Sequence, residues 1–291
     1  PMLDCPESPT TTDAPGERAG YPEIRFSVSE NATGDGCLAF VGPATATAGW
    51  TAVTLHNDGM APHIMPMYFL GEHTLDDFVQ AMSSGEEPDW AVPVGGVGVA
   101  TPFQTATVIM ELQEGNYAIV CFFEGHHLRG MYRQLTVEHP DEHDEVGEHP
   151  ELPAPTANYT IELNDFAFVV PNMTAGTHVI RVVNNGEQPH EAPLIRLNEN
   201  TSMQQFLAAI ENPQGPPPGA GVGGVNVLAP GAEAYFVVDL VAGDYGLVCF
   251  VTSPEHGAPH IALGMVAQFS VAAAGDAGAE GDDADATNTT A

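Results

Sequence analysis

The chain has 291 residues and carries 39 acidic against 6 basic residues, a formal net charge of −33. A surface this acidic repels nucleic acid and anionic membranes, so functions that depend on binding either of them are excluded. The acidity suits a high-salt environment, where screening relieves self-repulsion, and it equally suits a partner protein with a basic docking patch.

The length and the hydrophobic content of 43% predict two globular domains, each long enough to bury its own core. Apolar runs such as 118–123 and 235–238 are strand-sized and too short to cross a bilayer. Short strands separated by Gly and Pro turns, with one short helix in each half, indicate an all-β protein made of two antiparallel sandwiches.

Residues 1–21 are expected to form an N-terminal arm tied down by Cys5. Cys5 and Cys37 are the two cysteines outside the motifs described below, and in an extracytoplasmic protein we expect them to form a disulfide. The alternative for Cys5 is a lipid anchor, which Asp4 disfavours. No secretory signal is present, and a leader cleaved before Pro1 would leave no trace.

The first predicted domain spans 22–137. An apolar strand ends at the Asn-x-Gly turn in LHNDGMAPHIMPM, and the chain re-enters through Pro62-His63. A short amphipathic helix is predicted over 74–82, opened by a capping box between Thr74 and Asp77.

The end of this domain carries the cysteine. A Pro/Gly loop leads to Val-Gly-Gly-Val at 94–97. The segment TVIMELQEGNYAIVCF at 107–122 then predicts a hairpin with a Gly turn, whose second strand ends at Cys121.

Residues 138–157 are acidic, Pro-rich and without apolar periodicity, which indicates an exposed linker. Its histidines, His139, His143 and His149, either bind metal weakly or simply belong to a solvated segment. The acidic residues 273–291 are typical of a solvated tail.

The second predicted domain, 158–272, follows the same order of features. VNNGEQPHEAPL contains Pro189-His190, SMQQFLAAI at 202–210 opens with a capping box, and Val-Gly-Gly-Val returns at 222–225. The segment YFVVDLVAGDYGLVCF at 235–250 then delivers Cys249.

Each cysteine belongs to a set of candidate metal ligands. A histidine and a methionine follow each cysteine in order, and a Pro-His pair precedes it. The sets are His63, Cys121, His126 and Met131 in the first half, and His190, Cys249, His260 and Met265 in the second. One thiolate, two imidazoles and a weak thioether are the ligands of a type 1 copper site.

Two of these assignments have rivals. His127 competes with His126, and His256 competes with His260, but His126 and His260 share the same spacing to the following methionine. The three methionines around His63 (Met60, Met65 and Met67) either form a soft cluster that receives Cu(I) or pack in the core. Ile64 and Glu191 follow the first histidines, so the two sites should differ in polarity.

Both halves resemble the cupredoxins, the blue copper proteins that include plastocyanin, pseudoazurin and halocyanin. The resemblance rests on the Pro-His and Cys–His–Met motifs and covers about 22–137 and 158–272. It implies a Greek-key β-sandwich in each half, with one copper ion held by each ligand set.

The resemblance also separates carriers from enzymes. Multicopper oxidases and copper nitrite reductases of this family have a histidine beside the Cys ligand, whereas Val120 and Phe122 flank Cys121, and Val248 and Phe250 flank Cys249. The function we expect is therefore electron transfer to a redox partner, without catalysis. The alternatives are copper storage, or a structural subunit of a surface layer or filament that self-assembles.

An extracytoplasmic location is expected as well. Five Asn-x-Ser/Thr sequons favour a surface-exposed, glycosylated protein; they start at Asn31, Asn158, Asn172, Asn200 and Asn288.

Overall fold

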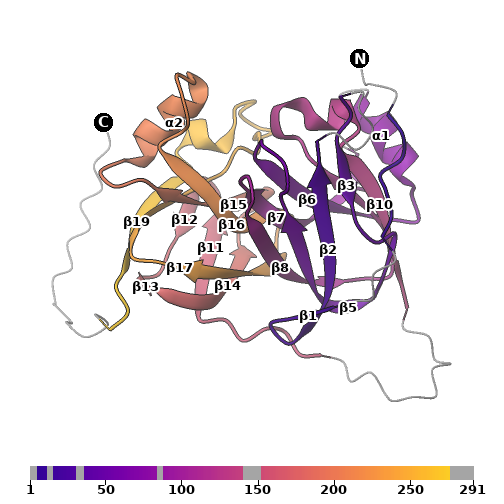
Figure 1. Ribbon diagram of the computed structural model, residues 1–291, viewed down its shortest axis with the longest axis horizontal. Coiled ribbons are helices and arrows are strands. Elements are labelled where there is room, and N and C mark those ends of the chain that lie inside the picture. Colours follow the sequence, from indigo (N-terminus) through magenta and orange to yellow (C-terminus); the bar gives the residue numbers. More distant parts are fainter. Residues whose placement is uncertain (1–4, 12–15, 31–35, 84–87, 140–151, 276–291) are drawn as a thin grey trace.

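The computed structural model describes residues 5–11, 16–30, 36–83, 88–139 and 152–275 (Figure 1). Its first half contains β1 (Gly16–Arg18), β2 (Tyr21–Ser29), β3 (Ala39–Val41), β4 (Thr45–Thr47), β5 (Gly49–His56), β6 (His63–Gly71), α1 (Leu75–Ser83), β7 (Val92–Ala100), β8 (Thr105–Leu112), β9 (Gly115–Val120), the 3₁₀ turn η1 (Phe123–Arg129) and β10 (Tyr132–Glu138). No described helix has the length and apolar character needed to span a membrane.

From β2 onward, the described residues of the second half follow the same order of elements. It contains β11 (Tyr159–Asn164), β12 (Ala167–Val169), β13 (Met173–Thr174), β14 (Gly176–Asn184), β15 (His190–Leu197), α2 (Met203–Glu211), β16 (Gly219–Leu228), β17 (Glu233–Leu240), β18 (Gly243–Val248), the 3₁₀ turn η2 (His260–Leu263) and β19 (Val266–Ala272). The all-β fold class is confirmed, and each half is a two-layered sandwich.

The expectation that these sandwiches are purely antiparallel is wrong. In the first half β2 runs parallel to β5, and β4 runs parallel to β10. The second half has the same two parallel pairs, β11 with β14 and β13 with β19. An apolar pattern marks a strand but carries no information on the direction of its neighbour, so the sequence could not reveal these pairs.

The predicted hairpins at 107–122 and 235–250 are also wrong. The strands β8 and β9 do not pair with each other: β8 pairs with β5 and β17, while β9 pairs with β6 and β10. The Gly turn therefore carries the chain from one sheet to the other. The Tyr117 hydroxyl holds this crossing, since it donates to the Gln113 carbonyl and accepts from the Gln113 N–H.

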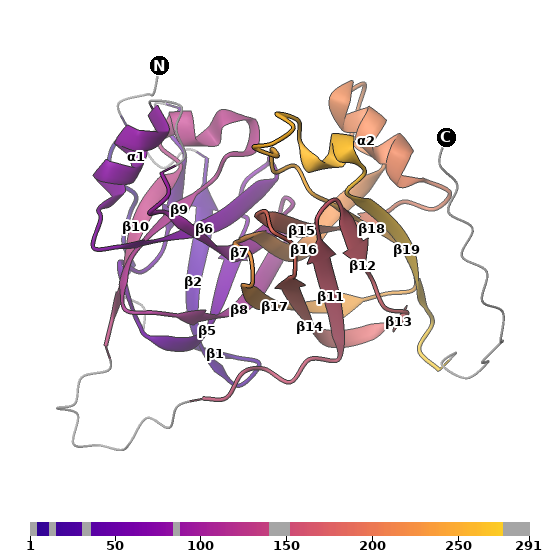
Figure 2. The same cartoon turned by 180° about the vertical axis from the view of Figure 1, so that it is seen from behind.

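The two helices form where the capping boxes predict them. The Thr74 hydroxyl accepts from the Asp77 N–H while the Asp77 carboxylate accepts from the Thr74 N–H, and Ser202 and Gln205 make the same reciprocal pair. Each helix covers the outer face of its sandwich, α1 beside β9 and α2 beside β19 (Figures 1 and 2).

The two halves are joined edge to edge in both layers. One sheet runs β1-β2-β5-β8-β17-β14-β11-β12, with β3 on β2, and the other runs β13-β19-β18-β15-β16-β7-β6-β9-β10-β4. Strands β8 and β17 form the junction in the first sheet, and β7 and β16 form it in the second. Each sheet therefore continues from one half into the other without an exposed edge at the junction.

The junction pairs matched positions of the two halves. Val108 lies opposite Phe236 in one sheet, and Val97 lies opposite Val225 in the other. In both pairs the two residues occupy the same place in their respective halves. An arrangement in which a surface meets its own counterpart is isologous, the geometry of a two-fold dimer, here within one chain.

The core crosses this junction. Val97, Val108, Val225 and Phe236 belong to a single buried apolar cluster that also contains both cysteines of the ligand motifs. The Val-Gly-Gly-Val segments allow two strands to approach each other closely. A Cβ on Gly96 would lie 2.1 Å from the Met65 carbonyl oxygen. No side chain fits there, so the segment brings β7 against β6 just beyond His63.

Several sequence features lie outside the described residues. These are most of the tail, the linker histidines His143 and His149, and the sequons at Asn31 and Asn288. The predicted arm, 1–21, is described at 5–11 and 16–21: Thr11 donates from its N–H to the Gly42 carbonyl, and β1 pairs with β2. The expected disulfide between Cys5 and Cys37 is present.

The shared sheets predict that the linker is not needed to keep the halves together. After cleavage at a protease site inserted within 140–151, we expect both fragments to co-elute in size-exclusion chromatography and to separate only in denaturant. Phe236→Asp should release the fragments, because it places a charge in the buried junction. Val169→Asp, at a position 52% exposed, is the control. Separation of the unmutated fragments in native buffer would contradict the interface.

Candidate copper centres

The first cluster forms where three elements end. His63 is the first residue of β6, Cys121 directly follows β9, and His126 lies in η1. Both imidazoles turn Nδ1 toward the thiol: Cys121 Sγ lies 3.8 Å from His63 Nδ1 and 3.5 Å from His126 Nδ1. All three side chains are buried.

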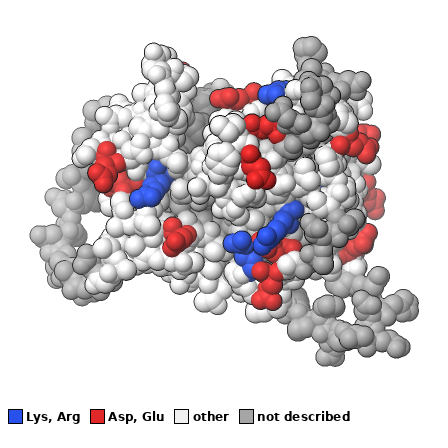
Figure 3. Space-filling view, in the orientation of Figure 1, with Lys and Arg blue, Asp and Glu red and all other residues white. Residues whose placement is uncertain are grey.

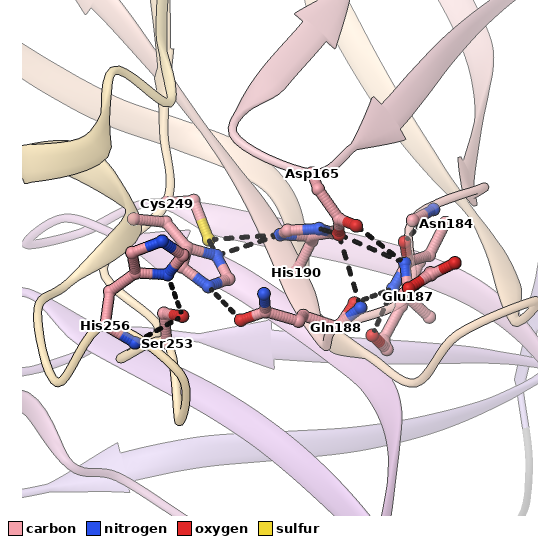
Figure 4. Close-up of polar contacts among 11 residues, drawn as sticks. Asp165, Asn184, Glu187, Gln188, His190, Cys249, Ser253 and His256 are labelled. Carbon is pink, nitrogen blue, oxygen red and sulfur yellow. Dashed lines mark hydrogen bonds and ion pairs between the residues drawn. The ribbon is translucent and has the colours of Figure 1, made fainter.

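The second cluster has the same construction and is shown in Figure 4. Cys249 Sγ lies 3.9 Å from His190 Nδ1 and 3.4 Å from His260 Nδ1, and the two Nδ1 atoms lie 2.9 Å apart. Donors that share one ion at bond lengths of about 2.0–2.3 Å lie roughly 3–4 Å apart, so these three atoms are close enough to hold one metal.

The predicted methionine ligands lie on the same loops. Met131 and Met265 are fully buried and belong to the same core cluster as the two thiols. The Cys121 N–H donates to the Met131 carbonyl at 3.0 Å, and the Cys249 N–H donates to the Met265 carbonyl at 3.2 Å. These bonds close each loop, so the methionine lies beside the cysteine it follows.

Strand order, loop closure and donor set therefore agree in the two halves. Each half is cupredoxin-like. Both donor sets, with one thiol, two imidazoles and a nearby thioether, are those of type 1 copper, which gives two copper sites in the chain. When bound, copper supplies one-electron redox chemistry there.

Comparisons with known proteins found matches among solved structures alone. No protein-family model and no curated protein matches the sequence. Among solved structures, auracyanin A, a blue copper protein from Chloroflexus aurantiacus, is 19% identical over 40% of this chain and 98% of its own, with a TM-score of 0.28. Auracyanin from Roseiflexus castenholzii is also 19% identical, over 40% of this chain and 96% of its own, with a TM-score of 0.27.

A copper nitrite reductase from Nitrosomonas europaea spans both halves. It is 12% identical over 87% of this chain and 94% of its own, with a TM-score of 0.26. Scores this low add nothing to the argument, so the description of the sites rests on the strand order and donor geometry of this chain.

The rival histidines lie apart from the thiols. The His127 ring packs edge-on against Phe122, with 5.2 Å between the ring centroids, and its Nδ1 is buried without a hydrogen-bond partner. The exposed His256 has its Nδ1 3.0 Å from the Ser253 hydroxyl. The structure thus brings His126 and His260 to the cysteines, as their spacing to methionine predicts.

A carboxylate that the sequence did not reveal lies next to Nε2 of each first histidine, on the side of the ring away from the thiol. Asp165 Oδ1 lies 2.9 Å from His190 Nε2 and also accepts from the N–H groups of Glu187 and Gln188 (Figure 4). In the first half Glu30 Oε1 lies 3.3 Å from His63 Nε2 and accepts from two N–H groups of the loop before it. Such a partner fixes the ring with Nδ1 toward the metal and raises its basicity.

The Asn-x-Gly turns make room for these carboxylates. A Cβ on Gly59 would lie 2.3 Å from Glu30 Oε1, and a Cβ on Gly186 would lie 2.5 Å from Asp165 Oδ1. The buried Asn57 and Asn184 hold the turns, because each accepts from the glycine N–H and donates to two carbonyls. The turn motif is visible in the sequence, but it does not identify which carboxylate the glycine makes room for.

The second histidines differ between the sites. His260 Nε2 lies 3.1 Å from the Gln188 side-chain oxygen, whereas Ala61 stands at the position of Gln188 in the first half. There His126, with Glu30 and Arg129, lines an open cavity of about 240 Å³. The edge of the second imidazole is therefore covered in one site and faces a cavity in the other.

The residues after the first histidines differ as well. Glu191 is buried, and its carboxylate accepts from the Phe250 N–H at 2.8 Å, which ties β15 to the residue after Cys249. Burial raises the pKa of Glu191 to about 7. Ile64 replaces it in the first half, so the expected difference in polarity is present.

Burial also sets the protonation of the donors. It raises the pKa of the Cys121 thiol to about 11 and that of Cys249 to about 12. It lowers the pKa of His126 to about 4 and holds the pKa values of His63, His190 and His260 below their usual value. At neutral pH the imidazoles are neutral and the thiols are protonated.

These protonation states predict how copper binding depends on pH. Each thiol must lose one proton to coordinate, so apparent Cu(II) affinity should rise about tenfold per pH unit between pH 7 and 9. Titration against a chelator of known protonation measures this slope at each site, using Cys249→Ala to isolate the first and Cys121→Ala the second. A slope of zero would show that the thiol is not a ligand.

The carboxylate behind His190 gives a second prediction. Asp165→Asn keeps an oxygen acceptor but removes the negative charge, so copper affinity of the second site should fall by about 10- to 100-fold. The reduction potential of the second site should rise, because the lost negative charge no longer stabilises Cu(II) relative to Cu(I). Glu187→Gln, an exposed neighbour in the same turn, is the control and should change neither quantity. Equal effects of both substitutions would indicate only a long-range change in charge.

Proposed function

We propose that the chain is an extracytoplasmic electron-transfer protein with two mononuclear type 1 copper centres, one in each of the domains 22–137 and 158–272. The observation that carries this proposal is the matched pair of buried donor sets, each with a thiol facing two imidazole Nδ1 atoms. Such a site imposes one geometry on Cu(I) and Cu(II), which favours rapid electron exchange.

The neighbours of the thiols support a carrier over an enzyme. The chain after each cysteine continues with phenylalanine, Phe122 or Phe250, so no imidazole leads from the thiol to another metal. Across the described residues, only the two clusters around Cys121 and Cys249 combine three close His, Cys, Asp or Glu donors. The proposal therefore assigns no catalytic copper to this chain.

The charge distribution supports a basic redox partner. Among the described residues, three of the six arginines pair with carboxylates, namely Arg18 and Arg25 with Glu23, and Arg181 with Glu233. Figure 3 shows acidic side chains spread over one face, with basic ones beside them. This surface would steer a partner with a basic patch, with a rate that falls as salt rises.

The disulfide supports the extracytoplasmic location that we propose. A bond between Cys5 and Cys37 persists in an oxidising compartment and is rare in the cytosol. The sequons agree with this location.

The storage alternative is weakened by the methionines around His63. Met65 and Met67 are fully buried core residues, and only Met60, 74% exposed, reaches solvent. One exposed thioether makes a poor Cu(I) receiving site.

Colour tests the proposal directly. The copper-loaded protein should absorb strongly in the visible range through thiolate-to-Cu(II) charge transfer. Cys121→Ala and Cys249→Ala should each remove about half of this absorbance and one copper equivalent, and the double variant should remove all of it. A colourless Cu(II) protein, or a coloured double variant, would overturn the assignment.

NMR line broadening in mixtures of oxidised and reduced protein measures electron self-exchange, which separates a carrier from a storage protein. A carrier should exchange electrons far faster than it loses copper to a Cu(I) chelator. Loss of copper at a rate equal to or above that of electron exchange would favour storage.

A further inference from the structure

The Cys5–Cys37 disulfide touches the ligand loop of the first site. The Leu38 N–H, next to the disulfide, donates to the Arg129 carbonyl at 2.8 Å, and Cys5 Sγ lies 3.2 Å from the same oxygen. Arg129 returns a bond through its Nε to the Gly36 carbonyl at 2.8 Å. The main chain of Arg129 is thus contacted from both halves of the disulfide, and its side chain bonds to the residue before Cys37.

The contact falls on the glycine that turns the loop. Gly130 has φ +85°, and its N–H bonds to the carbonyls of His126 and His127. A Cβ at this position would lie 2.7 Å from the Cβ of Cys5. The disulfide therefore packs directly on the backbone between the second histidine and Met131.

The arm continues this contact along the strand that follows. The Ser8 hydroxyl donates to the Tyr132 carbonyl, and Arg133 Nη1 donates to the carbonyls of Pro9 and Phe40. Residues 5–11 thus lie along the start of β10, immediately after the ligand loop.

The matching loop of the second site has no such cover. Gly264 has φ +103°, and its N–H bonds to the carbonyls of His260 and Ile261, as Gly130 does with its own loop. Yet, apart from its own chain neighbours, no atom of the described residues lies within 4 Å of where a Cβ on Gly264 would be. That loop is held from within its own half, by Gln188 on His260.

We propose that the Cys5–Cys37 disulfide is a positioning element of the first copper site, which holds the loop 126–131 in its ligand geometry. Reduction of this bond loosens the first site and leaves the second unchanged. The copper part rests on the proposed function, whereas the effect on the loop does not need metal.

A dithiol is a reductant that can open this bond. Cys5 is half-buried while Cys37 is buried, so one thiolate attacks Cys5 Sγ and displaces the Cys37 thiolate. The second thiol of the reductant then displaces Cys5. The two cysteines gain two electrons and two protons, and the dithiol becomes a cyclic disulfide.

Amide hydrogen exchange on the metal-free full chain tests the loop. In the Cys5→Ala/Cys37→Ala variant, the Gly130 and Met131 amides should exchange at least about tenfold faster than in the unmutated protein, as expected for local opening. The Gly264 and Met265 amides should not change. Unchanged exchange at Gly130 and Met131 would overturn the proposal.

Two controls separate positioning from general stability. Amides of β8 report opening of the whole domain, and Ser8→Ala removes an arm contact while it keeps the disulfide. If β8 and the loop accelerate by the same factor, the disulfide only stabilises the fold and the proposal is wrong. If Ser8→Ala accelerates the loop as much as loss of the disulfide, the arm and not the disulfide is the positioning element.

Copper release gives an independent readout. In a Cys249→Ala background only the first site remains, and loss of the disulfide should speed copper transfer to a Cu(I) chelator by about tenfold, in line with faster local opening. In a Cys121→Ala background the rate should not change. Equal acceleration in both backgrounds would overturn the proposal, whereas absence of bound copper in both would overturn the proposed function and leave hydrogen exchange to decide.

Discussion

Each metal site depends on one backbone contact, the hydrogen bond from the cysteine N–H to the carbonyl of the methionine that ends its loop. In both halves the methionine N–H also donates back to the carbonyl of the second histidine. These bonds bring the end of one strand and the start of the next together with the histidine between them. The strands on either side of the loop thus place the cysteine, the histidine and the methionine next to one another.

The first histidine reaches the same point through the other neighbouring strands. It begins β6 or β15, and a glycine-kinked strand packs so closely beside it that no Cβ fits at Gly96 or Gly224. The kinked strands β7 and β16 are the ones that pair across the junction. The contact that joins the halves therefore also supports the strands that carry His63 and His190, so the two sites sit in a fixed relation.

The sequence revealed what local chemistry dictates. Both capping boxes begin helices, and the spacing to methionine selects His126 and His260 over His127 and His256. These features depend on a few neighbouring residues, so the pattern alone defines them.

Other features depend on contacts between distant segments and could not be predicted. The sheet switch at Gly115 has the same apolar alternation as a hairpin, and parallel and antiparallel neighbours look alike in sequence. Glu30 and Asp165 are ordinary acids among many in a chain with 39, and only the fold places them behind an imidazole. The junction between the halves could not be predicted either, since Val108 and Phe236 have the sequence pattern of ordinary core residues.

The two halves hold the same ligand loop by different means. In the second half, side chains of the domain itself do so: Gln188 on His260, and Glu191 on the residue after Cys249. The first half has Ala61 and Ile64 at these positions, which can make neither bond. Its loop is held instead from outside, through the disulfide against Gly130 and the arm on β10. A buried donor set needs some such restraint, because an unbound thiol and two imidazoles gain little from staying together, and the halves differ in which part of the chain supplies it.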